Sequence, residues 1–433
     1  MMALRRLFLV ALVVLSSTVV WAEELTLYRL WQMALKNHEA LYIAKEGLQQ
    51  ARFDIKRAYS TLLPSLTVES TYTRYSEEKK VGSFLIQPEE AVRFEARLSQ
   101  TIYNGGKEWS LLRQARKRLK ATKWAEEDVK EAILLDVSGA FFNLLKAEKE
   151  VEIRKASLRR AEEHLKTARA LFKVGLRTKV DLLRAETEVA TKQSALIEAE
   201  AAVRDAAALL KRLTGYRGEL RVKEPQGEAS FEGTPEEFLK IALEKRKDYQ
   251  QKLIEEQIAK EGIRYAKGEF LPSLSIDGVY TWRDQNPRTS FFIEDILYGG
   301  LTVRLPLFEG GLRVAELKKA RSVLRQKELE KYSLKRDIEL EIRRLYNDIE
   351  KIASLVRALR KRLEFARENY RMALKQYRHG IIRSTDLVDA ETVLVDAELS
   401  LMNAQMDYRF AIMRLKKSTG VLLEEALKRL PED

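Results

Sequence analysis

The sequence predicts a mainly α-helical fold with a few β-strands, in which one structural unit occurs twice. Four short motifs recur in the same order in both halves: Leu-Pro-Ser-Leu at 63–66 and 271–274, Gly-Gly at 105–106 and 310–311, a glycine before Asp-Leu at 175 and 380, and Thr-Gly at 214–215 and 419–420. The second copy follows the first by 208 residues at the first motif and by 205 residues at the other three. A nearly constant offset over such a length indicates a duplicated unit.

Each copy begins with a helix and continues into a β-hairpin. Residues 25–61 have apolar side chains at helical spacing, and Pro64 ends that pattern. The period then changes to two, which predicts a strand with one apolar and one polar face, and an alternating segment around 92–98 predicts its return strand. We therefore expect one hairpin at 62–104 and its counterpart at 271–309, with the second return strand over 297–307.

The rest of each copy predicts a long helical hairpin. Apolar positions recur in alternating steps of four and three over about 107–172 and 312–377, a heptad pattern typical of helices packed in coiled coils. Each helix would extend roughly 100 Å at 1.5 Å per residue. Tight turns containing Gly175 and Gly380 follow, and helices return over 181–213 and 386–418.

These elements predict the domain organisation. In chain order we expect a signal peptide at 1–22, a first repeat at 23–216, a connector at 217–234 outside the helical shaft, a second repeat at 235–420 and a tail at 421–433. Arg5 and Arg6 precede the apolar run Leu7–Val20, and Val20-Trp21-Ala22 resembles a cleavage site. The run is shorter than the ~20 residues that a spanning helix requires, so we prefer a cleaved signal to a membrane anchor. No Cys is present to carry a disulfide or a lipid.

Composition argues against several classes of function. The net charge is +13, but Lys and Arg alternate with Glu along the helices, which indicates solvated helix faces and no nucleic-acid partner. His38, His164 and His379 lie far apart without ligand spacing, so we expect ordinary surface imidazoles and no metal site. With no nucleophile–base pair, phosphate loop or cofactor motif, the sequence predicts a protein that is not an enzyme and has no catalytic or cofactor-binding residues.

The strands predict contact with lipid. The neighbouring helices use their apolar seams on each other, which leaves the apolar strand face to be covered by a membrane. Four strands cannot close a barrel, and open edges in hydrocarbon are costly, so the membrane interpretation requires a dimer with eight strands or a trimer with twelve. Charged residues on the other face, such as Glu69, Arg93 and Glu95, favour the wider, water-filled barrel. The alternative is a soluble coiled-coil protein with two small hairpin domains.

With these motifs in this order, the chain resembles the TolC-like outer membrane efflux protein family over essentially its whole mature length. The resemblance implies a homotrimer in the bacterial outer membrane, with a shared twelve-stranded β-barrel and a helical α-barrel that crosses the periplasm. It further implies a passive export duct of a tripartite efflux or type I secretion system. A periplasmic adaptor would open the duct and an inner-membrane pump would energise it. The competing hypothesis is a periplasmic coiled-coil adaptor or scaffold without channel activity.

The resemblance also implies roles for residues at the two helical turns. Asp386 and Asp389 are similar to acidic residues that line the periplasmic pore mouth, where three-fold symmetry would make rings of carboxylates that attract cations. Helix capping is the alternative role, most of all for Asp181 and Asp386, which lie in the first turns of their helices.

The same resemblance implies a latch and a docking surface. Asp181 and Tyr377 match residues that hold the tip closed; the family's arginine two residues after the second turn's glycine is Ile382 here, so Arg383 would have to replace it. The residues similar to the adaptor-docking turns are Val174, Gly175, Leu176, His379, Gly380 and Ile381. For the glycines, the turn geometry alone is the alternative reason.

Overall fold

The same order of helices and strands occurs in both halves of the protein. The computed structural model describes residues 24–225, 231–289 and 291–429, so the expected signal peptide at 1–22 lies outside the described residues. The first half contains α1 (Leu27–Asn37), α2 (Glu39–Ser60), β2 (Ser65–Arg74), β5 (Glu90–Asn104), α3 (Lys107–Lys173) and α4 (Lys179–Thr214). The second half contains α5 (Pro235–Lys245), α6 (Lys247–Gly268), β7 (Ser273–Asn286), β8 (Asp295–Arg304), α7 (Leu312–Arg378) and α8 (Ser384–Ser418).

Five short elements add to this order: β1 (Glu24–Leu25), β3 (Lys79–Val81), β4 (Phe84–Gln87), β6 (Arg221–Val222) and α9 (Leu422–Arg429). β1 and β6 form a parallel pair, so the expected connector contains a strand. β3 and β4 form a small hairpin between β2 and β5. α9 lies in the expected tail, where Leu422, Leu423 and Ala426 are buried.

The chain divides into two units. One comprises Met1–Glu39, Lys130–Ala242 and Glu339–Asp433, and the other comprises Ala40–Val129 and Leu243–Ile338. The long helices α3 and α7 contribute to both units. The first unit is called the helical unit below, and the strands of the large sheet belong to the second unit.

The prediction of a single helix over 25–61 is wrong, because the chain leaves the helix at His38. His38 has an extended conformation, and the Asn37 side chain donates a hydrogen bond to the Thr214 carbonyl at 3.1 Å. α1 buries Leu30 and Trp31, and the Trp31 indole donates to the Leu134 carbonyl at 3.0 Å. These contacts hold α1 in the first unit, whereas α2 belongs to the second.

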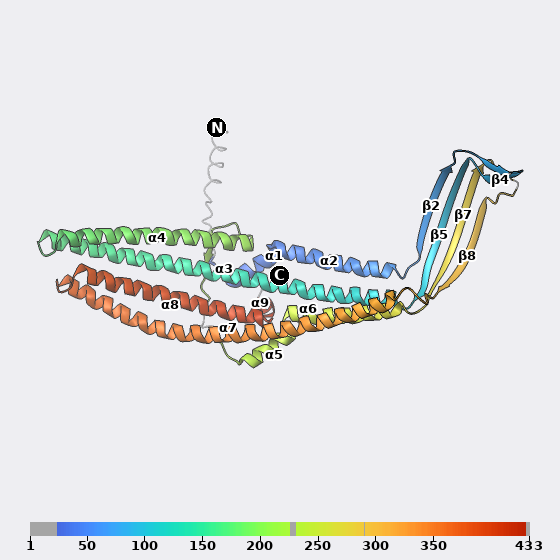
Figure 1. Cartoon of the computed structure of the whole chain (residues 1–433). Coiled ribbons are helices and arrows are strands. Elements are labelled where there is room, and N and C mark those ends of the chain that lie inside the picture. The colour runs from blue at the N-terminus through green and yellow to red at the C-terminus, as the bar shows by residue number, and fades with distance from the viewer. Residues whose placement is uncertain (1–23, 226–230, 290, 430–433) are drawn as a thin grey trace, which may run out of the picture. The chain divides into compact units, whose positions relative to one another are not determined.

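The heptad prediction is confirmed in the helical unit. Ile342, Leu345 and Ile349 on α7 are nearly completely buried. The α7 seam packs on α8 in successive layers: Leu345 and Ile349 with Ile412 and Leu415, Leu363 and Ala366 with Leu394 and Ala397, and Ala373 and Tyr377 with Leu387 and Ala390. α7 and α8 therefore form an antiparallel coiled-coil pair (Figure 1).

The second unit contains a four-stranded antiparallel sheet in the order β2-β5-β7-β8 (Figure 1). The alternation predicted from sequence is confirmed: Leu66, Val68, Leu297 and Leu301 lie on one face and are 60–79% exposed. Arg93, Glu95 and Arg97 occupy the other face of β5. β8 ends at Arg304, before the predicted end at 307, because Pro306 has no N–H to donate to the ladder.

A close backbone approach joins the sheet to its helices. Gly105 has φ +63°, and a Cβ placed on it would lie 2.0 Å from the Gly268 carbonyl oxygen. The junction between β5 and α3 therefore packs against the end of α6 only because both positions are glycine. Among the described residues, no helix is both long and apolar enough to cross a membrane.

Candidate functional site

Two turns of the helical unit have matching backbone geometry. Gly175, between α3 and α4, has φ +75°, and Gly380, between α7 and α8, has φ +78°. In both turns the glycine N–H and the next N–H donate to carbonyls of the preceding helix, at 3.0 and 2.9 Å. The positive φ explains glycine at both positions, because other residues enter that region only with strain.

The turns expose apolar side chains. Val174 is 69% exposed, and Leu176 and Ile381 are each 71% exposed. His379 and Gly380 are also exposed. The residues predicted to dock an adaptor are therefore accessible in this chain and present an apolar surface.

Asp181 and Asp386 cap the helices that follow the turns. Asp181 forms a capping box with Thr178 at the start of α4, and Asp386 accepts a hydrogen bond from the Arg383 N–H at 3.0 Å. Both carboxylates thus accept hydrogen bonds from N–H groups at the starts of their helices, which is the capping role given above as the alternative to a pore role. Asp389 is exposed one turn further along α8.

Arg177 links the two turns, a role that sequence reasoning missed. Its guanidinium donates to the Ile382 carbonyl at 2.6 Å and lies 4.9 Å from the centre of the Tyr377 ring. Arg383 instead has an 83% exposed side chain that comes within 3.9 Å of Asp386 and bonds neither Asp181 nor Tyr377. The sequence contains a signal for this role in the spacing of the turns. Arg177 lies two residues after Gly175, and this is the position that Ile382 occupies after Gly380, where the family has its arginine.

A buried polar layer lies behind the turns and draws one residue from each of four helices. His164 on α3 is 5% exposed; its Nδ1 lies 3.0 Å from a Glu188 oxygen on α4, and its Nε2 lies 3.2 Å from the Ser384 hydroxyl on α8. The ring packs edge-on against Tyr377 on α7, and burial raises the pKa of the Tyr377 hydroxyl. The expectation that His164 is a surface imidazole is wrong, because its polar partners allow it to be buried.

A second buried polar layer is centred on Glu391 of α8. The Glu391 carboxylate accepts from the Ser157 hydroxyl at 2.6 Å and pairs with Arg160 at 3.2 Å and Lys192 at 2.6 Å. Only 4% of its side chain is exposed, and Arg160 also lies over the Tyr370 ring. Removing one member of such a buried network would leave the remaining charges uncompensated and would destabilise the packing of these helices.

Both layers connect α3, α4 and α8 through buried hydrogen bonds and ion pairs. Of the residues predicted as the tip network, Tyr377 stacks with Arg177, which was not predicted, while Asp181 and Arg383 are engaged in their own helix starts. In the described part of the chain, no group of three or more His, Asp or Glu side chains is placed to hold a metal ion.

Duplicated coiled-coil hairpins joined to a half-apolar sheet define the class of TolC-type outer membrane channels. The chain belongs to the outer membrane efflux protein family, which it matches over residues 30–216 and 238–421. The family is one of efflux ducts and not a class of enzymes.

Individual relatives agree with this assignment. The chain is 23% identical to the outer membrane protein TolC of Vibrio cholerae over 354 residues, which are 79% of this chain and 76% of that one. The fold is similar to crystal structures of CusC, with TM-score 0.81, 18% identity and coverage of 91% of this chain and 92% of that one. For the CmeC outer membrane channel of Campylobacter jejuni, the TM-score is 0.80 and the identity 19%, with coverage of 94% and 90%.

Proposed function

We propose that this chain forms a homotrimeric export duct of a tripartite efflux or type I secretion system. The observation that carries the proposal is the four-stranded sheet, whose edge strands are β2 and β8. Its exposed apolar face suits lipid, but its open edges would leave unpaired backbone groups in hydrocarbon at several kcal/mol each. Three copies would close a twelve-stranded barrel with the polar face toward the lumen.

The helical unit has a separate part in the proposal. Its coiled-coil pairs would form the periplasmic α-barrel, and its turns would form the closed inner end. A periplasmic adaptor would dock on the exposed apolar turn residues Val174, Leu176 and Ile381, and through it an inner-membrane transporter would supply the energy. Asp386 and Asp389 would line the mouth, and Asp181, Tyr377 and Arg383 would lie at the tip, where Arg177 would hold the two turns together.

The proposed domain organisation keeps the expected boundaries. Residues 1–22 would be a cleaved signal peptide, and the repeats at 23–216 and 235–420 would each supply two strands and one helical hairpin to the trimer. The connector at 217–234 would lie outside the helical shaft, and residues 421–433 would form the C-terminal tail. The mature chain would reside in the outer membrane with its helices in the periplasm, and it would carry no lipid on Cys.

The first experiment is the mass of the purified mature protein in detergent, by light scattering with the detergent subtracted. We expect a mass near three protomers. Leu301→Arg should reduce the trimer yield, because an arginine on a lipid face costs about 2–4 kcal/mol at the membrane midplane. The matched control is Thr302→Arg, since Thr302 lies on the polar face beside it. A detergent-free monomer, or equal yields for both variants, would contradict the shared barrel and favour the coiled-coil scaffold.

A further inference from the structure

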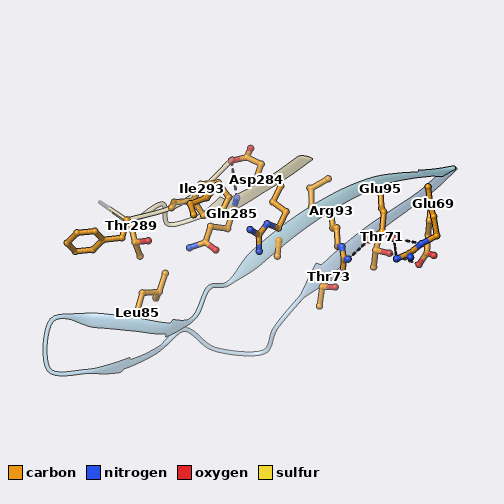
Figure 2. Close-up of a pocket in the computed structure, with 16 residues that line it drawn as sticks. Glu69, Thr71, Thr73, Leu85, Arg93, Glu95, Asp284, Gln285, Thr289 and Ile293 are labelled. Carbon is orange, nitrogen blue, oxygen red and sulfur yellow. Dashed lines mark hydrogen bonds and ion pairs between the residues drawn. The ribbon is translucent and has the colours of Figure 1, made fainter. Parts of the chain in front are cut away.

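A cavity of about 730 Å³ opens on the polar face of the sheet (Figure 2). Its floor is lined by residues of β2, β5 and β7, including Glu69, Arg93 and Arg283. Its rim consists of apolar side chains from β4 and from the segment between β7 and β8: Leu85, Phe291, Phe292 and Ile293. A charged floor beneath an apolar rim is the arrangement that an amphipathic solute would need.

Most charges on this floor are already compensated. Glu95 accepts hydrogen bonds from both Arg93 and Arg97, the latter at 2.8 Å. Asp284 is paired with Arg288 at 2.8 Å. Arg93, Glu95 and Arg97 are alternate residues of β5, so their side chains lie on one face of the sheet and neutralise each other locally.

Arg283 is the exception. Within the described part of the chain no carboxylate pairs with it, and its Nε is enclosed without a hydrogen-bond partner. It lies directly opposite Arg93 in the β5–β7 ladder, and like charges at opposed positions of an antiparallel pair destabilise the sheet. Glu69 does not relieve this, because its strand is two positions away in the sheet, about 10 Å at ordinary strand spacing.

We propose that the Arg283 pocket binds the acidic group of an amphipathic organic anion. A carboxylate or phosphate seated against the terminal nitrogens of the Arg283 guanidinium would supply the counter-charge that this side chain lacks in the described part of the chain. The apolar body of the solute would contact Phe291 and Ile293, whose side chains are 87% and 59% exposed.

This inference rests on the proposed function for its setting, because the polar face would line the duct lumen. Three copies would present three Arg283 pockets around the lumen. The pocket would then favour anionic amphiphiles over cations of the same size in the outer segment of the duct.

The test is equilibrium binding of naphthoate, a fluorescent aromatic carboxylate, to the detergent-solubilised protein by fluorescence anisotropy. Naphthylmethylammonium, a cation of similar size, is the reference ligand, and protein-free micelles are the blank. We expect naphthoate to bind more tightly than the cation. Arg283→Gln should weaken naphthoate binding about tenfold, the effect of one lost hydrogen bond to a charged group.

Two further variants make the outcome decisive. Arg74→Gln removes the same charge from the same sheet but outside the pocket, and it should leave naphthoate binding unchanged. Arg283→Lys keeps the charge without the planar fork, so its affinity should fall between wild type and Arg283→Gln. Equal binding of the two ligands, or equal effects of Arg283→Gln and Arg74→Gln, would overturn the anion site.

The proposed duct is judged by a different readout, the conductance of the wild-type protein in planar bilayers. Conductance without selective naphthoate binding would overturn the pocket and leave the duct standing. Selective binding without conductance would contradict the duct and leave an anion site on the sheet.

Discussion

At the scale of single residues, Glu261 on α6 shows how this protein holds a buried charge. Its side chain is 2% exposed and is bound by Arg113 at 2.8 Å, Lys117 at 2.9 Å and Arg264 at 2.7 Å. Burial by itself would raise the pKa of this carboxyl, but the three cations outweigh burial and lower it to about 2. A carboxylate that is easier to ionise in the folded state than in the unfolded state stabilises the fold above its ordinary pKa.

The contribution of Glu261 to the stability of the fold therefore depends on pH. The stabilisation from Glu261 is complete above pH 4.5, its ordinary pKa, and is lost as the pH falls from there toward about 2. A shift of that size corresponds to about 3 kcal/mol. We expect Glu261→Gln to lower the thermal midpoint at pH 7, and the gap to wild type to close as the medium is acidified.

Circular dichroism melts at a series of pH values measure that gap. Glu316→Gln is the control, because Glu316 is an exposed helical carboxylate that only approaches Lys319 at 3.6 Å, and such pairs contribute little. A gap between Glu261→Gln and wild type that stays constant down to pH 2 would contradict the assignment.

At the scale of elements, the two turns show which features local sequence can predict. The heptads, the period-two strands and the glycines with positive φ arise from contacts within a few residues, and all three were predictable. The break at His38 was not, because it depends on Asn37 reaching Thr214. The early end of β8 was predictable in principle, since Pro306 stands in the sequence.

Because Arg177 joins the two turns, we expect its removal to affect the gating of the proposed channel. Arg177→Gln removes the bond to the Ile382 carbonyl and the stacking on Tyr377, so the closed arrangement should weaken about tenfold relative to the open one. Arg383→Gln should have a small effect, because its side chain is exposed and contacts only its own helix start.

Single-channel recordings of both variants in planar bilayers measure this difference. We expect larger or more frequent open conductance for Arg177→Gln. A stronger effect of Arg383→Gln would show that Arg383 is the latch in the assembled trimer, as the resemblance to the family implied.

At the scale of the whole molecule, the proposed trimer determines how Asp386 and Asp389 would affect the ion preference of the pore. The Asp386 carboxylate is engaged with the start of α8 and lies near Arg383, which offsets its charge, whereas Asp389 is exposed. We therefore expect Asp389→Asn to reduce the cation preference of the channel more than Asp386→Asn does. Asp386→Asn should mainly weaken the helix cap, by up to about 1 kcal/mol.

Reversal potentials in a potassium chloride gradient report this preference. Glu364→Gln, an exposed substitution on α7, is the charge-matched control. If neither aspartate variant differs from that control, the two residues do not line the pore mouth.

The sequence by itself determined the duplicated order of elements, the alternating strands, the heptad seams and the glycine turns, because each follows from the chemistry of neighbouring residues. Only the tertiary structure decided that Arg177 bridges the turns, that His164 is buried and that Arg283 lies opposite Arg93 with no carboxylate partner among the described residues. These features depend on which distant segments meet. Arg177 and Ile382, for example, are 205 residues apart, which is also the distance in sequence between the two copies of the repeat. A local pattern sets the kind of element, whereas the partner of a polar side chain is set by packing across the fold.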